Sequence, residues 1–292
     1  MSGQTPSFHP SPGKPKQRLP KGACDSHVHV FGPSAVFPYA KDAPFVPADA
    51  PKDMLFAMHA ALGIEHCVIV QSTCHGFDNS VVADAIKAKN GAYCGIALAP
   101  ASVDGEELKR LDGQGFRGLR FNFMKRLGDG SKIEDVIALG ARLAPLEMHL
   151  QLHFESSMIH ELAPWLRKSA VPVVIDHMGR VDAARGVDQP DFRALLDLME
   201  DRRILVKVSG PERCSKQAAP YRDAIPFAAK LVAEFGHRTF WGTDWPHPNL
   251  NHVPDDGQLA DLLVEIAPSE AQRQALLVDN PRRFYRYLPS PA

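Results

Sequence analysis

Residues 23–31 read ACDSHVHVF, a short apolar run that carries two histidines. Its length and apolar content are typical of a strand buried on both faces. Side chains alternate along a strand, so His27 and His29 should face the same side. Two imidazoles on a buried strand are costly unless they form hydrogen bonds or bind a ligand. The stretch therefore predicts either two hydrogen-bonded core histidines or part of a functional site at a strand end.

Seven more short apolar runs follow, and segments with helical character separate them. The predicted strands are 23–31, 66–72, 92–100, 116–122, 147–154, 171–177, 204–210 and 239–246. The predicted helices are 52–62, 79–90, 104–113, 134–144, 157–168, 189–200, 219–235, 257–266 and 270–278. We expect Asp53, Ser157 and Asp188 to cap the first, fifth and sixth of these helices. Strand and helix alternate eight times, which predicts a parallel sheet.

The sheet could be open and doubly wound or closed into a barrel. The chain contains neither GxGxxG after the first strand nor GxxxxGK[ST] anywhere, so an open nucleotide-binding sheet lacks its usual signatures. Polar clusters fall at the ends of six predicted strands, and a closed barrel brings all of those ends to one site. We therefore predict an α/β fold, a (β/α)8 TIM barrel, as a single domain over residues 23–292. Residues 1–22 are rich in Pro, Lys and Gly and predict an irregular N-terminal arm.

Composition excludes several kinds of partner. The formal net charge of -1 offers no basic excess for nucleic acid. No run of about 18 apolar residues could cross a membrane, and the first 22 residues lack the apolar stretch of a signal peptide. The five cysteines are odd in number and form no CxxC pair, which favours free thiols in a reducing compartment. We expect a cytoplasmic protein with a small-molecule partner; its oligomeric state cannot be inferred from these features.

Further candidate site residues lie at the ends of later strands. Asp244 follows the eighth strand directly, although an aspartate near a proline is also common in turns. His177 ends the sixth strand, and His153 lies near the end of the fifth. His149, deeper in the fifth strand, is expected to be structural. Asp176 should face away from His177 by strand alternation, so we expect no catalytic role for it.

Several segments carry a resemblance to a known family. Together with the histidines and Asp244, the C-terminal NPRRFY resembles the amidohydrolase superfamily and its amidohydrolase-2 branch, from about residue 23 to 287. The match is closest to the 2-pyrone-4,6-dicarboxylate hydrolase family, whose members open a lactone to 4-oxalomesaconate or 4-carboxy-2-hydroxymuconate in the protocatechuate 4,5-cleavage of lignin-derived aromatics. The segments that carry it are DSHVHVFGP, DMLFAM, VIVQSTCHGFDN, GFRGLRFNFMKR, VVIDHMGR, VKVSGPERCS and WGTDWPHPN.

The resemblance implies a role for each candidate. Asp244 would be the general base, with a pKa raised by partial burial. Catalysis would also involve His27, His29 and His177 as donors to the developing oxyanion. Arginine matches a carboxylate bidentately, which suits a dicarboxylate substrate. The candidate substrate-binding residues are Arg120, Arg126, Arg213, Ser72, Thr73, His75, His153 and His247.

The sequence allows two alternatives for the cofactor, no metal or a zinc ion. The family implies a reaction that needs no metal. However, His153 stands where the family pattern has tyrosine, and with His27, His29 and Asp244 it recreates a zinc ligand set. A zinc ion is therefore an alternative, as are another acidic lactone such as sulfomuconolactone, decarboxylation of an aromatic acid with zinc, and a binding protein without activity.

Overall fold

The computed structural model describes residues 5–125, 127 and 130–287. Within these residues, eight parallel strands form one sheet in sequence order. Hydrogen bonds from Ser26 N–H to the Trp241 carbonyl (2.9 Å) and from Asp244 N–H to the His27 carbonyl (2.8 Å) join the first strand to the segment after the last. The predicted α/β barrel is therefore confirmed. The strands are β1 (Cys24–Val28), β2 (His66–Val70), β3 (Tyr93–Ala97), β4 (Phe116–Asn122), β5 (His149–His153), β6 (Val173–Ile175), β7 (Ile204–Lys207) and β8 (Thr239–Phe240).

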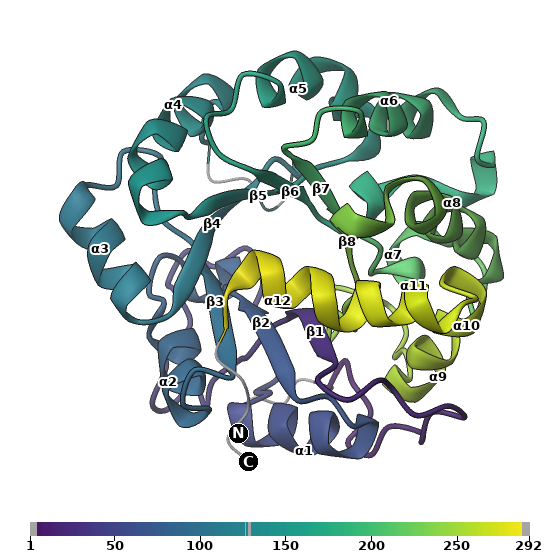
Figure 1. Cartoon of the computed structure of the whole chain (residues 1–292). Helices are drawn as coiled ribbons and strands as arrows, with labels where there is room; N and C mark the ends of the chain where they lie inside the picture. The colour runs from purple at the N-terminus through teal and green to yellow at the C-terminus, as the bar shows by residue number, and fades with distance from the viewer. Residues whose placement is uncertain (1–4, 126, 128–129, 288–292) are drawn as a thin grey trace.

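Helices surround the barrel (Figure 1). They present apolar side chains to the strands at helical spacing; the helix at 133–143, for example, buries Ile133, Val136, Leu139 and Leu143. The α-helices are α1 (Lys52–Leu62), α2 (Ser80–Ala88), α3 (Gly105–Gly113), α4 (Ile133–Leu143), α5 (Ile159–Leu166), α6 (Pro190–Met199), α7 (Pro211–Cys214), α8 (Ile225–Phe235), α9 (Asp256–Asp261), α10 (Leu263–Ile266), α11 (Glu270–Gln274) and α12 (Asn280–Tyr285). A π-helical stretch, Ala275–Asp279, joins the last two.

The C-terminal helix closes one end of the barrel. In Figure 1, α12 crosses in front of the strands. Tyr285 at its end is fully buried and packs with the interior residues Cys24, Val174 and Phe240. His149, expected to be structural, also lies here, with its ring 5.6 Å from that of Tyr285. The candidate polar site residues therefore lie at the opposite end of the barrel, at the C-terminal ends of the strands.

The N-terminal segment lies against the loop that follows β8. Residues 5–22 contain neither helix nor strand. The Phe8 ring lies 5.1 Å from the Trp245 ring, and Ser7 Oγ donates to the Pro246 carbonyl at 2.5 Å. Farther along, the Gly13 N–H donates to the Asp255 carboxylate. The arm is therefore attached to the segment that carries the candidate base.

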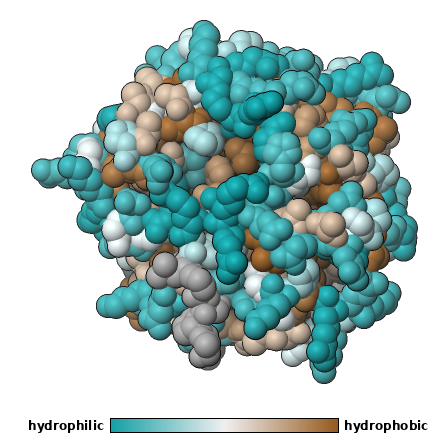
Figure 2. Space-filling view, in the orientation of Figure 1, coloured by the Kyte–Doolittle hydropathy of each residue, from teal (hydrophilic) through white to brown (hydrophobic). Residues whose placement is uncertain are grey.

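The outer surface is mainly polar. Figure 2 shows hydrophilic residues over most of one face, with hydrophobic ones in scattered patches. Among the described residues, no helix combines the length and the apolar character that a membrane span requires.

Candidate active site

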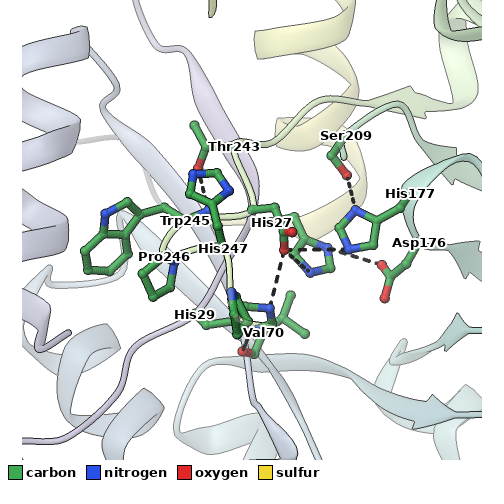
Figure 3. A network of polar contacts seen from close by, with 12 residues as sticks. His27, His29, Val70, Asp176, His177, Ser209, Thr243, Trp245, Pro246 and His247 are labelled. Carbon is green, nitrogen blue, oxygen red and sulfur yellow. Dashed lines mark hydrogen bonds and ion pairs between the residues drawn. The ribbon is translucent and has the colours of Figure 1, made fainter. Parts of the chain in front are cut away.

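Three imidazoles surround one carboxylate oxygen at the ends of the strands. The Nε2 atoms of His27, His29 and His177 lie 3.6, 3.5 and 3.6 Å from Asp244 Oδ1. All four side chains are buried, and Figure 3 shows the three histidines converging. The structure thus brings together the four residues predicted to be catalytic.

The backbone around this cluster determines where each side chain points. The pairing of β1 with β2 shifts register between Asp25 and Val28. Asp25 faces α1 and the loop after β8: its Oδ2 accepts a hydrogen bond from Thr243 Oγ1 at 2.6 Å and lies 3.4 Å from His59 Nε2. Asp25 therefore holds Thr243, the residue before Asp244, and does not orient any of the three clustered imidazoles.

The hydrogen bond of His29 fixes its tautomer. Its Nδ1 lies 2.7 Å from the Val70 carbonyl, which can only accept. A neutral His29 therefore carries its proton on Nδ1 and presents a lone pair on Nε2. The expectation that a neutral His29 donates to an oxyanion does not agree with this geometry. His177 is less constrained, because its Nδ1 lies 3.0 Å from Ser209 Oγ, a hydroxyl that can donate or accept.

Two charged residues behind His27 also belong to the cluster: Asp176, for which we expected no catalytic role, and Lys207, which was not predicted. Asp176 Oδ1 lies 3.2 Å from His27 Nδ1, and its Oδ2 accepts from Arg120 Nε at 2.9 Å. The expectation that Asp176 faces away is wrong, because β6 ends at Ile175 and strand alternation stops there. Lys207 Nζ lies 3.3 Å from His27 Nδ1. A lysine inside the run ILVKVSG was the signal that could have revealed it.

Arginines line the wall of the pocket above the histidines. Arg120 and Arg213 lie there as predicted, and Arg180 was missed. Arg213 Nε donates to Asp244 Oδ2, so the candidate base is ion-paired in this structure. Arg126 lies outside the described residues. The other predicted residues that line the pocket are Ser72, Thr73 and His153.

Two predicted substrate-binding residues lie elsewhere. The Nδ1 of His75 lies 3.1 Å from the Pro38 carbonyl, and its ring lines a neighbouring pocket. His247 is fully buried, with Nε2 at 3.0 Å from Asp256 Oδ1. Both imidazoles have structural partners, so their placement does not support the predicted contact with substrate.

The ionisation of the cluster follows from burial and from its cations. Burial raises the pKa of Asp244, but Arg213 and the imidazoles outweigh it, and the pKa lies well below its usual value. The expectation of a raised pKa is therefore wrong. Burial lowers the pKa of His27 to about 3, so this ring is neutral at pH 7. Burial also lowers the pKa of Lys207, to about 8, although the nearby Asp176 carboxylate offsets part of this decrease.

Part of this cluster could hold a metal ion. One ligand atom from each of His27, His177 and Asp244 lies within 4.8 Å of the others. This group differs from the predicted one, because His29 and His153 are not in it. The ligand atoms suit zinc in kind. However, Arg213 already pairs with Asp244, and Lys207 lies against His27. The charge around the ligand atoms therefore does not fit a divalent cation.

Comparison with known proteins shows which family the chain resembles along nearly all of its length. The amidohydrolase family profile matches residues 24–287. The chain is 43% identical over 288 residues to 2-pyrone-4,6-dicarboxylate hydrolase of Comamonas testosteroni, covering 95% of this chain and 94% of that protein. It is 40% identical over 274 residues to 4-sulfomuconolactone hydrolase of Hydrogenophaga intermedia, covering 91% and 89%.

A solved structure supports the same relationship. A protein of Acinetobacter baumannii that carries the name of a 2-pyrone-4,6-dicarboxylic acid hydrolase, with citric acid bound, has a TM-score of 0.80 and 25% identity. The alignment covers 91% of this chain and 99% of that one. From the match over nearly its whole length, this chain is a member of the amidohydrolase family.

Proposed function

We propose that the protein hydrolyses the lactone ester of 2-pyrone-4,6-dicarboxylate, without an obligatory metal, to 4-oxalomesaconate or 4-carboxy-2-hydroxymuconate. The observation that carries the proposal is the buried Asp244 carboxylate, which three imidazoles face, in a pocket that arginines also line. It agrees with the 43% identical relative of that name. The reaction would serve the catabolism of lignin-derived aromatics, and the five buried free cysteines favour a cytoplasmic location.

Binding would begin at the arginines. Guanidinium groups of Arg120, Arg180 and Arg213 suit the two carboxylates of the substrate, and Ser72 and Thr73 add hydroxyl donors. A substrate carboxylate would compete with Asp244 for Arg213, because both are anions that accept from the same guanidinium. Substrate binding would thus free the Asp244 carboxylate from its ion pair with Arg213, so that it can accept a proton from water.

Hydrolysis would follow on the floor of the pocket. A water molecule would donate a hydrogen bond to the Nε2 lone pair of His29 and keep that proton. Its other proton would transfer to Asp244, the general base. The water oxygen bonds to the lactone carbonyl carbon, and His177 donates to the carbonyl oxygen when its Nδ1 accepts from Ser209. Collapse breaks the ring C–O bond, and the leaving oxygen takes the proton from Asp244.

The test compares three substrates at neutral pH by loss of lactone absorbance. We expect a much higher kcat/KM for 2-pyrone-4,6-dicarboxylate than for the uncharged 2-pyrone, since the arginines bind carboxylates. Asp244→Asn should lower kcat by about 10²–10⁴-fold, the usual contribution of a general base. Arg193→Met, at an exposed arginine far from the site, is the control. Preferred turnover of uncharged lactones would refute the substrate assignment.

A second candidate is 4-sulfomuconolactone. A relative at 40% identity carries that activity in its name. A sulfonate presents anionic oxygens to arginine much as a carboxylate does. The third substrate in the same assay is therefore 4-sulfomuconolactone, and a higher kcat/KM for it would favour this candidate.

A further inference from the structure

Lys207 is a buried cation that the reaction above does not use. It is the last residue of β7, and its side chain is fully buried. Its Nζ lies 3.3 Å from His27 Nδ1 and 3.8 Å from Asp176 Oδ1. Burial of an ammonium group is costly unless it is paired, so its position beside a catalytic imidazole calls for an explanation.

The contact with His27 restricts where that ring holds its proton. An ammonium group has donors only, so a hydrogen bond from Nζ makes Nδ1 the acceptor. The proton of the neutral ring then lies on Nε2, which faces Asp244 Oδ1 at 3.6 Å. This tautomer is opposite to that of His29, which is set by the Val70 carbonyl.

A hydrogen bond to Asp176 would instead favour the tautomer of His27 that has its proton on Nδ1. Asp176 Oδ1, 3.2 Å from the same Nδ1, can only accept and would require a proton there. That proton would then face the Lys207 ammonium, which is a repulsive contact. The lone pair on Nε2 would also face the Asp244 carboxylate, in addition to the His29 lone pair that already does so. Donation from Lys207 avoids both. Asp176 keeps Arg120 Nε as a donor at 2.9 Å in either case.

We propose that Lys207 is a positioning residue that holds the proton of His27 on Nε2. His27 then donates to the oxygen of the reacting carbonyl, and its Nε2 has no lone pair with which to bind a metal. Without Lys207, Asp176 would draw the proton to Nδ1, and the Nε2 lone pair would become available. The catalytic part of this inference rests on the proposed function; the tautomer does not.

The first test locates the His27 proton by NMR, beginning with the wild-type protein. In ¹⁵N-labelled enzyme at neutral pH, with the His27 signals assigned by comparison with His27→Gln, we expect Nε2 to be the protonated nitrogen. In Lys207→Met, which keeps the length of the side chain but removes its donors, the proton should move to Nδ1. Leu205→Met, a buried substitution on the same strand, is the matched control and should leave the signals unchanged.

Zinc binding and kinetics provide independent readouts. Calorimetric titration with Zn²⁺ alone should show that Lys207→Met binds it about 10–100-fold more tightly than the wild type or Leu205→Met, the range of such outer-shell effects. The kcat of metal-free Lys207→Met should fall by about 10²-fold, as for loss of one oxyanion donor, with KM little changed.

Each failure has its own meaning. A proton on Nδ1 of His27 in the wild type would overturn the proposal even if the variant does not fold. An unchanged tautomer and an unchanged zinc affinity in folded Lys207→Met would also overturn it. If the tautomer and zinc affinity shift but no variant hydrolyses the dicarboxylate lactone, the role of Lys207 stands and the proposed function fails.

Discussion

At the scale of single residues, the site includes several non-glycine residues with positive φ, and two of them belong to the central cluster. Asp244 has a φ of 68° and His177 a φ of 49°. Such conformations are uncommon outside glycine and cost free energy, of order 1–3 kcal/mol each. The cost at Asp244 is offset in part by its N–H bond to the His27 carbonyl and by the anchoring of Thr243 on Asp25. The strand ends thus bring the histidines close, and these turns aim Asp244 and His177 at one point.

In the proposed mechanism, Arg213 connects substrate binding to the ionisation of Asp244, and Arg213→Met should reveal both effects. We expect KM for the dicarboxylate to rise by about tenfold or more, since a charge-assisted hydrogen bond is lost. Burial then acts on the Asp244 pKa without its main opposing cation, so that pKa rises. Because the reaction needs the carboxylate form, the acid limb of kcat/KM should move to higher pH. Identical acid limbs in the variant and in wild type would contradict the account, with Arg193→Met as the control.

Strand-end position was enough to predict the four central residues, and it failed for their neighbours. His27, His29, His177 and Asp244 share the ends of parallel strands, which a barrel must bring together. Asp176 was misjudged because alternation holds only within a strand. Lys207, Arg180 and His247 contact residues from other strands and loops. The sequence of one segment does not show which of these residues its side chains will reach. Arg126 remains a prediction.

At the scale of elements, apolar periodicity predicted the helices and strands better than capping motifs did. All eight predicted strands are present, and α1 has the predicted bounds. The predicted caps are wrong: α1, α5 and α6 begin after Pro51, Met158 and Gln189, none of which caps through its side chain. Packing against the barrel decides where these helices begin, because burial outweighs a single cap.

A buried ion cluster ties three elements together. His247, after β8, lies 3.0 Å from Asp256 in α9 and 3.7 Å from Glu212 in α7. Burial lowers the pKa of His247, but these two carboxylates outweigh it and raise the pKa to about 10. Since the folded pKa exceeds the usual 6.5, the stabilisation is complete below about pH 6.5 and disappears as pH rises through 10.

His247→Gln tests this cluster through stability. At about pH 6 the variant should lose about 2 kcal/mol of unfolding free energy, the scale of a hydrogen bond between charged groups. Denaturant unfolding of both proteins from mildly acidic to alkaline pH should show the difference shrink towards pH 10. A difference that stays constant with pH would mean that His247 stabilises the fold without its charge.

At the scale of the whole molecule, the two chain ends stabilise opposite ends of the barrel. The helix α12 closes one end with Tyr285, and the arm covers the loop after β8 with Phe8. Phe8→Ala should lower the unfolding free energy by about 2 kcal/mol, less than for a fully enclosed phenylalanine. It should also lower kcat severalfold, because the loop that carries Asp244 loosens. The exposed Val36→Ala is the control, and an unchanged kcat would show that the arm does not support the site.

The central claim is that this barrel opens a dicarboxylate lactone with its own side chains. The most direct measurement follows the turnover of 2-pyrone-4,6-dicarboxylate before and after chelation, with the metal content determined on the same sample. We predict that kcat is unchanged in protein containing far less than one metal ion per chain. Activity that disappears on chelation and returns with zinc would contradict the metal-free mechanism, while no turnover in either state would contradict the proposed substrate.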